Sequence, residues 1–256
     1  MKSFCFTVDD NIRFLKEINE RGYDSIFLHP YLAMLKRLHE RFDLKIQLNL
    51  FFRMNDFDLS QMSECYRSEW ASVSDWLKLS FHSELENVRP YENSGFDEVF
   101  SDCRDVNDEI LRFASEKSLA KTTTVHYCQT TEDGVRALAE NGVIGLLGLF
   151  GSEASPSSSY SIEEELAAKI RSGEVLSIDG VSFAAIDMVI NTFRCEDILP
   201  KLGELSFRDS LRVMIHEQYF YEDYKAYQPD FEEKLITVFS YLTNENYSSF
   251  FFEELI

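Results

Sequence analysis

Two kinds of hydrophobic pattern alternate along the chain. Short runs of apolar and β-branched residues are separated by longer segments in which apolar residues recur every three or four positions. The short runs predict strands, and the longer segments predict amphipathic helices that pack on a sheet. The predicted strands cover residues 3–8, 45–52, 76–81, 121–127, 143–150, 185–191, 211–215 and 249–252. The predicted helices cover residues 31–41, 61–73, 96–115, 131–141, 162–171 and 230–242.

The order of these elements predicts an α/β fold. Repeated strand–helix units indicate a parallel sheet, and about eight of them in 256 residues are typical of a distorted (β/α) barrel of about seven or eight parallel strands. We expect a single domain that covers residues 1–256, since barrels of this length are usually one domain. Two segments depart from the pattern. Asp179-Gly180 lies between short β patterns and predicts a hairpin over residues 175–183, whereas the Ser-rich residues 152–161 predict a surface loop.

The chain is strongly acidic. It has 25 Lys and Arg against 45 Asp and Glu, a formal net charge of −20, and no basic stretch interrupts this excess. Such a charge repels phosphate backbones and anionic lipids, so we expect no nucleic-acid partner. The sequence contains no run of 18 apolar residues, so we also expect no membrane insertion.

Cysteine usage and the N-terminus predict a cytoplasmic protein. The five cysteines are an odd number, are widely spaced and include no Cys-x-x-Cys pair. This pattern indicates reduced thiols and therefore a reducing compartment. Residues 1–3 lead directly into a strand, without the longer apolar region and small-residue cleavage site of a signal peptide.

Polar residues with catalytic potential gather at the ends of predicted strands. Asp9 and Asp10 follow the first strand, and His82, His126 and His216 each end a later one. In a parallel barrel the C-terminal strand ends share one face, on which active sites are built, so these side chains are expected to converge. Taken singly, the acidic pair also fits an ordinary turn, and each histidine also fits a hydrogen-bonded core imidazole. The coincidence of all five on one face favours a site.

The segment after His82 carries a second signal. His82 and Glu86 are four residues apart. If one helical turn follows the strand, both side chains project from the same side, which suits the binding of one metal ion. Pro90 would end that turn. A solvated acidic turn is the alternative for Glu86, and His29 and His39, in a turn and a helix, carry no comparable signal.

Three short motifs resemble those of the NodB-type polysaccharide deacetylases, carbohydrate esterase family 4. Phe6-Thr7-Val8-Asp9-Asp10 resembles the family's Thr-Phe-Asp-Asp-Gly, and His82-Ser83-Glu84-Leu85-Glu86 resembles its His-Ser-x-x-His. Ile215-His216 matches its late strand-end histidine in type and place. The resemblance implies a divergent member with a NodB-like barrel and the following roles: catalytic base for Asp9, metal ligands for Asp10 and His82, third ligand position for Glu86, and general acid for His216.

The chain departs from the family pattern in three places. Asn11 replaces the Gly of the first motif, and Glu86 replaces a metal-binding His. Residues 124–128 stand where the family has an Arg-Pro-Pro-Tyr-Gly-like segment, and His126 within them is the alternative source of the missing imidazole. The implied cofactor is a divalent metal ion. A set of Asp, His and Glu favours manganese, iron or cobalt, and zinc also fits.

The resemblance implies metal-assisted hydrolysis of an acyl group, here an N-acetyl group on a sugar or glycan precursor, with a role in surface-polysaccharide biosynthesis. The metal would polarise the acyl oxygen and activate water, Asp9 would remove the proton of that water, and His216 would protonate the leaving nitrogen. Asp187, near the end of the strand over residues 185–191, is placed to orient His216 or hold its charge. A buried charge held by the backbone is the alternative for Asp187.

Other functions fit the same residues. One is a catalytically lapsed barrel that binds a glycan or a nucleotide-linked sugar, which the degraded motifs suggest. Another is a metal-dependent hydrolase of a different amide or of an ester, including a phosphate ester. The acidic charge and the lack of a phosphate-binding Gly-rich loop disfavour a phosphate ester. Phe52, Arg53 and Tyr219 end or follow strands on the same face, where they would line a substrate groove or contribute to packing.

Overall fold

The computed structural model describes residues 2–86, 91–151 and 159–256. Its strands are β1 (Lys2–Asn11), β2 (Ile46–Met54), β3 (Phe57–Asp58), β4 (Leu77–Leu85), β5 (Thr122–Thr123), β6 (Gly145–Gly148), β7 (Leu176–Ile178), β8 (Val181–Ala185), β9 (Met188–Val189), β10 (Ser210–His216) and β11 (Tyr247–Ser249). Its α-helices are α1 (Arg13–Arg21), α2 (Pro30–Phe42), α3 (Arg67–Ser72), α4 (Phe96–Phe113), α5 (Glu132–Glu140), α6 (Glu164–Arg171), α7 (Cys195–Leu205) and α8 (Phe231–Asn244).

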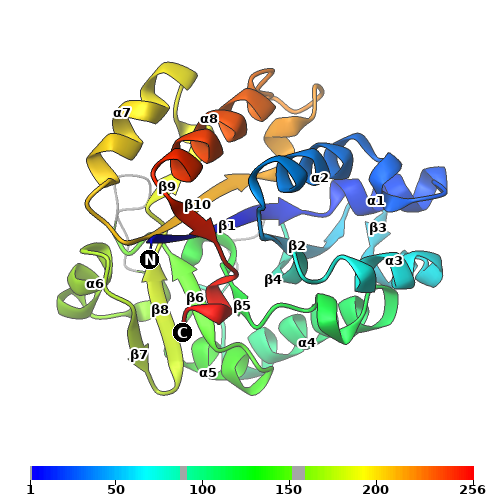
Figure 1. Ribbon diagram of the computed structural model, residues 1–256. Helices are drawn as coiled ribbons and strands as arrows, with labels where there is room; N and C mark the ends of the chain where they lie inside the picture. The colour runs from blue at the N-terminus through cyan, green and yellow to red at the C-terminus, as the bar shows by residue number, and fades with distance from the viewer. Residues whose placement is uncertain (1, 87–90, 152–158) are drawn as a thin grey trace.

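Parallel strands form a distorted barrel with helices on the outside (Figure 1). One sheet places β4, β2, β1, β10 and β9 side by side, and the other places β5, β6 and β8 side by side. Two junctions connect the sheets. At the first, the amide of Ala120 donates to the carbonyl of Leu79, 2.8 Å away, which joins β4 to the segment before β5. At the second, Ile186 donates to Gly148 on β6 and Asp187 donates to Arg212 on β10, each at 2.8 Å.

Side chains of β1 alternate between the two faces of the barrel wall, as the period of two requires. Phe4 and Phe6 pack outward on α8, with their rings 6.0 and 4.9 Å from the ring of Phe239. Cys5 belongs instead to a separate buried cluster that contains Leu147 and Met214. The main core therefore lies between strands and helices, and a smaller core lies inside the barrel.

The structure confirms the predicted fold class and the hairpin. Asp179 and Gly180 both have positive φ, 50° and 83°, as the tight turn between antiparallel β7 and β8 needs. The predicted strand over residues 121–127 is wrong beyond Thr123, because the chain turns there into a 3-10 helix, η5 (His126–Cys128). Residues 152–158 of the expected Ser-rich loop lie outside the described residues, and Ser159–Ser161 forms a short 3-10 helix.

Helix α1 was not predicted, because the side chain that caps its N-terminus comes from a residue far away in the sequence. Its N-cap residue, Ile12, has no side-chain cap. The carboxylate of Glu217 replaces the cap, accepting from the amides of Ile12, Arg13 and Phe14 at 2.8, 3.1 and 2.7 Å. Glu217 follows the last residue of β10, so it ties the end of that strand to the chain that leaves β1.

Glu217→Ala is expected to lower the free energy of unfolding by at least about 2 kcal/mol, because each buried N–H left without an acceptor costs about 1–3 kcal/mol. Denaturant unfolding would measure the loss. Glu222→Ala, an exposed substitution five residues further on, is the control and should leave the midpoint unchanged. Equal midpoints for both variants would contradict the capping role.

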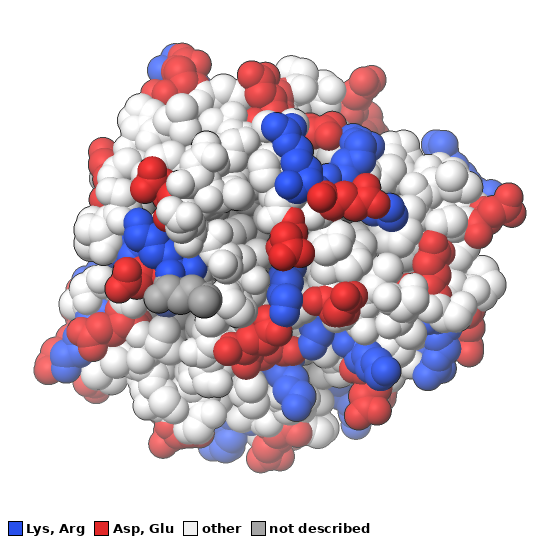
Figure 2. Space-filling view, viewed as in Figure 1, with Lys and Arg blue, Asp and Glu red and all other residues white. Residues whose placement is uncertain are grey.

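Charged side chains of both signs are interspersed on the surface that Figure 2 shows. On the face drawn in Figure 2, the Lys and Arg side chains lie among Asp and Glu side chains and form no continuous basic stripe of the kind that binds nucleic acid. In the part of the chain that the structure describes, none of the helices has the length and apolar character needed to cross a membrane.

Candidate metal centre and pocket

A β-bulge directs the two adjacent carboxylates to the same side of β1. Val8 pairs with Leu48 and Asn11 pairs with Leu50, so β1 holds one residue more than β2 over this stretch. In a regular strand, Asp9 and Asp10 would point to opposite faces. The bulge, with a positive φ of 62° at Asp10, instead lets both side chains line the same pocket.

Asn11 holds this bulge in place. Its side-chain amide donates to the carbonyl of Val8 at 2.5 Å and to that of Asn49 at 3.2 Å. The hydroxyl of Tyr31 donates to the Asn11 side-chain oxygen at 3.0 Å. Asparagine at this position, where the NodB motif has glycine, therefore stabilises the strained backbone with its side chain.

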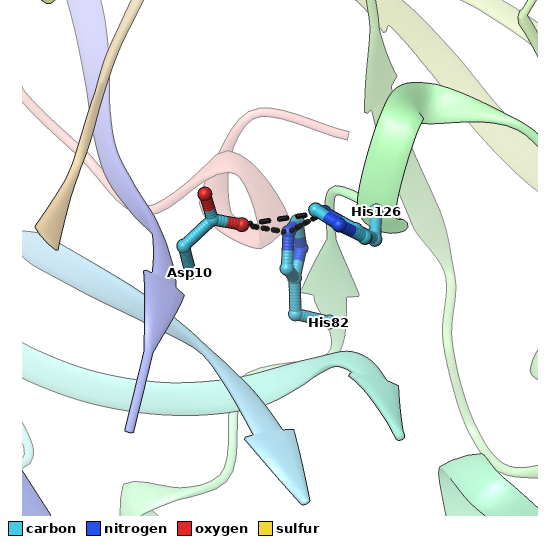
Figure 3. Close-up of side chains that lie close together, drawn as sticks. All are labelled: Asp10, His82 and His126. Carbon is cyan, nitrogen blue, oxygen red and sulfur yellow. Dashed lines mark hydrogen bonds and ion pairs between the residues drawn. The ribbon is translucent and has the colours of Figure 1, made fainter. Parts of the chain in front are cut away.

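A second bulge presents His82. On the β2–β4 pair, Leu50 is opposite Phe81 and Phe51 is opposite Ser83, which leaves His82 as the extra residue of β4. Bulges re-aim side chains next to active sites. His82 is buried, and its imidazole points toward Asp10 (Figure 3).

His126 completes a group of three. It begins the 3-10 helix η5, in which Tyr127 and Cys128 have left-handed backbone conformations. Nε2 of His82 and Nδ1 of His126 lie 3.0 and 3.2 Å from Oδ1 of Asp10, and the two nitrogens are 3.1 Å apart (Figure 3). Three atoms at this spacing can share one ion with bonds of about 2.0–2.2 Å.

Main-chain carbonyls fix the tautomers of both imidazoles. Nδ1 of His82 lies 2.5 Å from the carbonyl of Thr124, and Nε2 of His126 lies 2.7 Å from that of Glu86. Carbonyls only accept, so each of these nitrogens must carry the proton. Nε2 of His82 and Nδ1 of His126 are then bare lone pairs that face the carboxylate of Asp10. Three acceptors thus converge with no proton between them, which a bound cation would stabilise.

The electrostatics of the group agree with this arrangement. Burial lowers the pKa of His82, which favours the neutral imidazole that binds metals. Burial acts to raise the pKa of Asp10, but protonated imidazoles of His216, His126 and His82 would outweigh it and hold that pKa below its usual range. A bound cation would have the same effect on Asp10 when the imidazoles are neutral. Asp10 is therefore an ionised carboxylate.

Glu86 does not join this group. The predicted helical turn after His82 is wrong, because β4 continues to Leu85 and four residues of strand span about 13 Å. Glu86 contributes its carbonyl to His126, and its side chain lines the pocket, where burial and the charge of Asp10 raise its pKa. Pro90, expected to end the turn, lies outside the described residues.

Asp9 and His216 lie opposite each other on β1 and β10. Oδ1 of Asp9 accepts from the side-chain amide of Asn49 at 2.6 Å. Burial and the charge of Asp10 raise the pKa of Asp9, which the hydrogen bond from Asn49 opposes. Nδ1 of His216 lies 2.9 Å from Oδ1 of Asn191. Burial lowers the pKa of His216.

Asp187 does not lie beside His216, and the expectation that it orients that imidazole is corrected. It accepts from the amide of Arg212 at 2.8 Å and pairs with the guanidinium of Arg208. Arg212 precedes His216 by four residues on β10, which corresponds to about 13 Å of strand. Asn191, after the short strand β9, takes the place expected for Asp187.

The group opens into a pocket of about 750 Å³ at the strand ends. Tyr219 lines it as expected, but Phe52 and Arg53 do not: Phe52 packs against the main core and Arg53 pairs with Glu84. Lining residues that the sequence did not single out include Tyr127, Glu92, Gln129, Asn191, Tyr224 and Lys225. His29 and His39 lie elsewhere, beside Glu17 and against Trp76.

Comparisons with known proteins show the fold. No protein-family model matches the sequence, and no curated protein matches it. A family 4 acetyl xylan esterase from Clostridium thermocellum, solved in complex with a cobalt ion, is 14% identical with a TM-score of 0.52, over 99% of this chain and 90% of the esterase. A 4-alpha-glucanotransferase from Thermococcus litoralis is also 14% identical with a TM-score of 0.62, over 99% of this chain but 40% of the transferase.

The chain therefore has the barrel fold of the carbohydrate esterase family 4 proteins, as the motifs predicted. Two solved proteins with different activities resemble it. The fold alone does not select a reaction, which depends on the residues of the site.

Proposed function

We propose that the protein is a metal-dependent hydrolase that removes an acetyl group from a carbohydrate. The observation that carries this proposal is the convergence of Oδ1 of Asp10, Nε2 of His82 and Nδ1 of His126, three unprotonated acceptors within 3.2 Å of one another. A buried set of this kind fits a cation better than it fits an empty core. The esterase of the same fold was solved with cobalt, which supports a divalent ion.

The donor set fits a divalent transition metal. Two imidazole nitrogens and one carboxylate oxygen suit zinc, and also cobalt, iron or manganese. Main-chain carbonyls hold both histidines in the ligating tautomer, as outer-shell partners do in metalloenzymes. When bound, the ion would supply Lewis acidity, polarising the acyl oxygen and lowering the pKa of water.

The remaining polar groups of the pocket fit the proton transfers of hydrolysis. As water forms a bond to the acyl carbon, Asp9 takes a proton from that water. His216, opposite Asp9 on the adjacent strand β10, is placed for the second proton transfer, to the leaving group. His216 enters this step as the imidazolium and gives its Nε2 proton to the leaving nitrogen or oxygen as the bond of that atom to the acyl carbon breaks. It recovers a proton from Asp9 before the next turnover. The products are a carboxylate and a free amine or hydroxyl. The side-chain oxygen of Asn191 accepts a hydrogen bond from Nδ1 of His216, so Nε2 of His216 is the nitrogen that can exchange a proton with the substrate.

The pocket suits a carbohydrate. Tyr127, Tyr219 and Tyr224 line it, and aromatic faces with polar tips serve both stacking and hydrogen bonding. Its volume lies within the range of about 300–1,000 Å³ that is typical of ligand sites.

All five cysteines are free thiols, which supports action in a reducing compartment on a precursor for surface-polysaccharide assembly.

Released acetate is the readout that tests this function. Metal-loaded protein would be incubated with N-acetylglucosamine oligomers, a nucleotide-linked N-acetyl sugar and acetylated xylan. We expect acetate from at least one substrate and its loss after chelation. Tight binding of a sugar without any release of acetate would favour the lapsed barrel.

Asn191→Ala is expected to lower kcat by about 10- to 100-fold, because a general acid that is no longer oriented loses part of its contribution of about 10²–10⁴. Asn191→Asp keeps an acceptor at the same place and should recover most of the rate. Steady-state kinetics of both variants would test this. If neither substitution changes kcat, Asn191 does not position His216.

A further inference from the structure

One side of the barrel interior, formed by β2, β4 and β5, is polar. Gln47 and Asn49 on β2, Ser80 on β4 and Thr122 on β5 are all at most 2% exposed. They form one continuous chain of hydrogen bonds that ends at Asp9. A buried polar network of this extent is costly unless every member is satisfied.

The contacts of the chain are short. The hydroxyl of Thr122 donates to Oε1 of Gln47 at 3.0 Å, and Nε2 of Gln47 donates to the carbonyl of Thr122 and to Oδ1 of Asn49, both at 2.8 Å. The hydroxyl of Ser80 also donates to Oδ1 of Asn49, at 2.7 Å. Nδ2 of Asn49 donates to Oδ1 of Asp9 at 2.6 Å.

One main-chain carbonyl sets the direction of the whole chain. The carbonyl of Thr122 can only accept, so the amide nitrogen of Gln47 must face it. That nitrogen then donates to the oxygen of Asn49, and the nitrogen of Asn49 is left to face Asp9. The amide of Asn49 therefore cannot flip without breaking contacts with Gln47 and Ser80.

We propose that Asn49 is the positioning residue of the catalytic carboxylate. It holds Oδ1 of Asp9 in a hydrogen bond, which leaves Oδ2 as the oxygen that takes the proton from water. This inference rests on the proposed hydrolase function. It also gives the polar side of the barrel interior a role, since the network keeps Asp9 aligned beside the group of Asp10, His82 and His126. A misplacement of about 1 Å is enough to cost about 100-fold in rate.

Three substitutions and one control test the proposal. Asn49→Ala should lower kcat by about 10- to 100-fold with KM and bound metal nearly unchanged, because binding groups stay in place. Asn49→Asp should lower kcat further, because it sets a second carboxylate against Asp9. Ser80→Ala, which removes one of two donors to Asn49, should give a smaller loss. Asn107→Ala removes a buried amide of α4 that bonds to Cys103 and Asn141, and should leave kcat unchanged.

A second readout does not depend on turnover. In metal-free protein, the side-chain amide protons of Asn49 should give a shifted, slowly exchanging NMR signal that moves on Asp9→Ala and not on Asn107→Ala. A parental kcat in both Asn49 variants, with the parent active, would overturn the positioning role and leave the hydrolase function intact. A parent without activity on any acetylated sugar would overturn both. An Asn49 signal that is insensitive to Asp9→Ala would show that the hydrogen bond does not form.

Discussion

Asp9→Asn is expected to lower kcat for acetate release by about two to four orders of magnitude, the size of a general-base contribution. The substitution preserves shape, so KM should change much less than kcat, because proton transfer stabilises the transition state more than the ground state. Asp9 is not one of the three converging acceptors, so bound metal should remain near the parental amount. Steady-state kinetics and elemental analysis of the same sample would measure both quantities.

Asp43→Asn is the matched control for this variant. Asp43 is exposed at the C-terminus of α2 with a positive φ of 52°, a conformation that asparagine also adopts readily. Its kcat should equal that of the parent. If Asp9→Asn has the same kcat as the parent, Asp9 is not the general base and is only a buried carboxylate at a strand end.

His126→Ala is expected to lower the affinity for a divalent ion by more than about 100-fold, since even outer-shell partners of a metal are worth about 10- to 100-fold. His126 supplies one of three ligand atoms, and Asp10 and His82 alone leave an incomplete set. Equilibrium dialysis against zinc or cobalt would give the dissociation constants. Turnover at a limiting metal concentration should fall in parallel.

Glu86→Gln is the control that separates the two possible third ligands. Glu86 lines the same pocket, but its hydrogen bond with His126 is made by the main-chain carbonyl. Metal affinity should therefore stay within a few-fold of the parent. The reverse result, with tight binding in His126→Ala and weak binding in Glu86→Gln, would restore Glu86 as the ligand that the His-Ser-x-x-His resemblance implied.

The positions of β1, β2, β4 and β10 were predictable from the sequence, because buried parallel strands are near-continuous apolar runs. The same reasoning placed Asp9, Asp10, His82, His126 and His216 on one face, and the structure brings all five to one pocket. The two bulges could not be predicted, because one extra residue changes pairing with a neighbouring strand and leaves no trace in the local pattern.

Assignments that depended on spacing within one segment were less successful. The pairing of His82 with Glu86 assumed a helical turn, but the chain stays extended, so His126 from the next strand unit fills the group instead. Asp187 was predicted to lie beside His216 because it is near the end of a predicted strand. In the structure it lies beside Arg212, four residues before His216 on β10. The residue that hydrogen-bonds to an imidazole at a strand end depends on the register between neighbouring strands, and register could not be predicted from the sequence.

Hydrolysis by this site is expected to require one divalent ion per chain. Metal-free protein would be titrated with cobalt while acetate release from the most active substrate is followed. We expect no release without the ion, a linear rise to one equivalent per chain and a plateau beyond it, with His82→Ala inactive throughout. Release that is independent of the ion, or one tightly bound ion with no release from any acetylated sugar, would contradict this expectation.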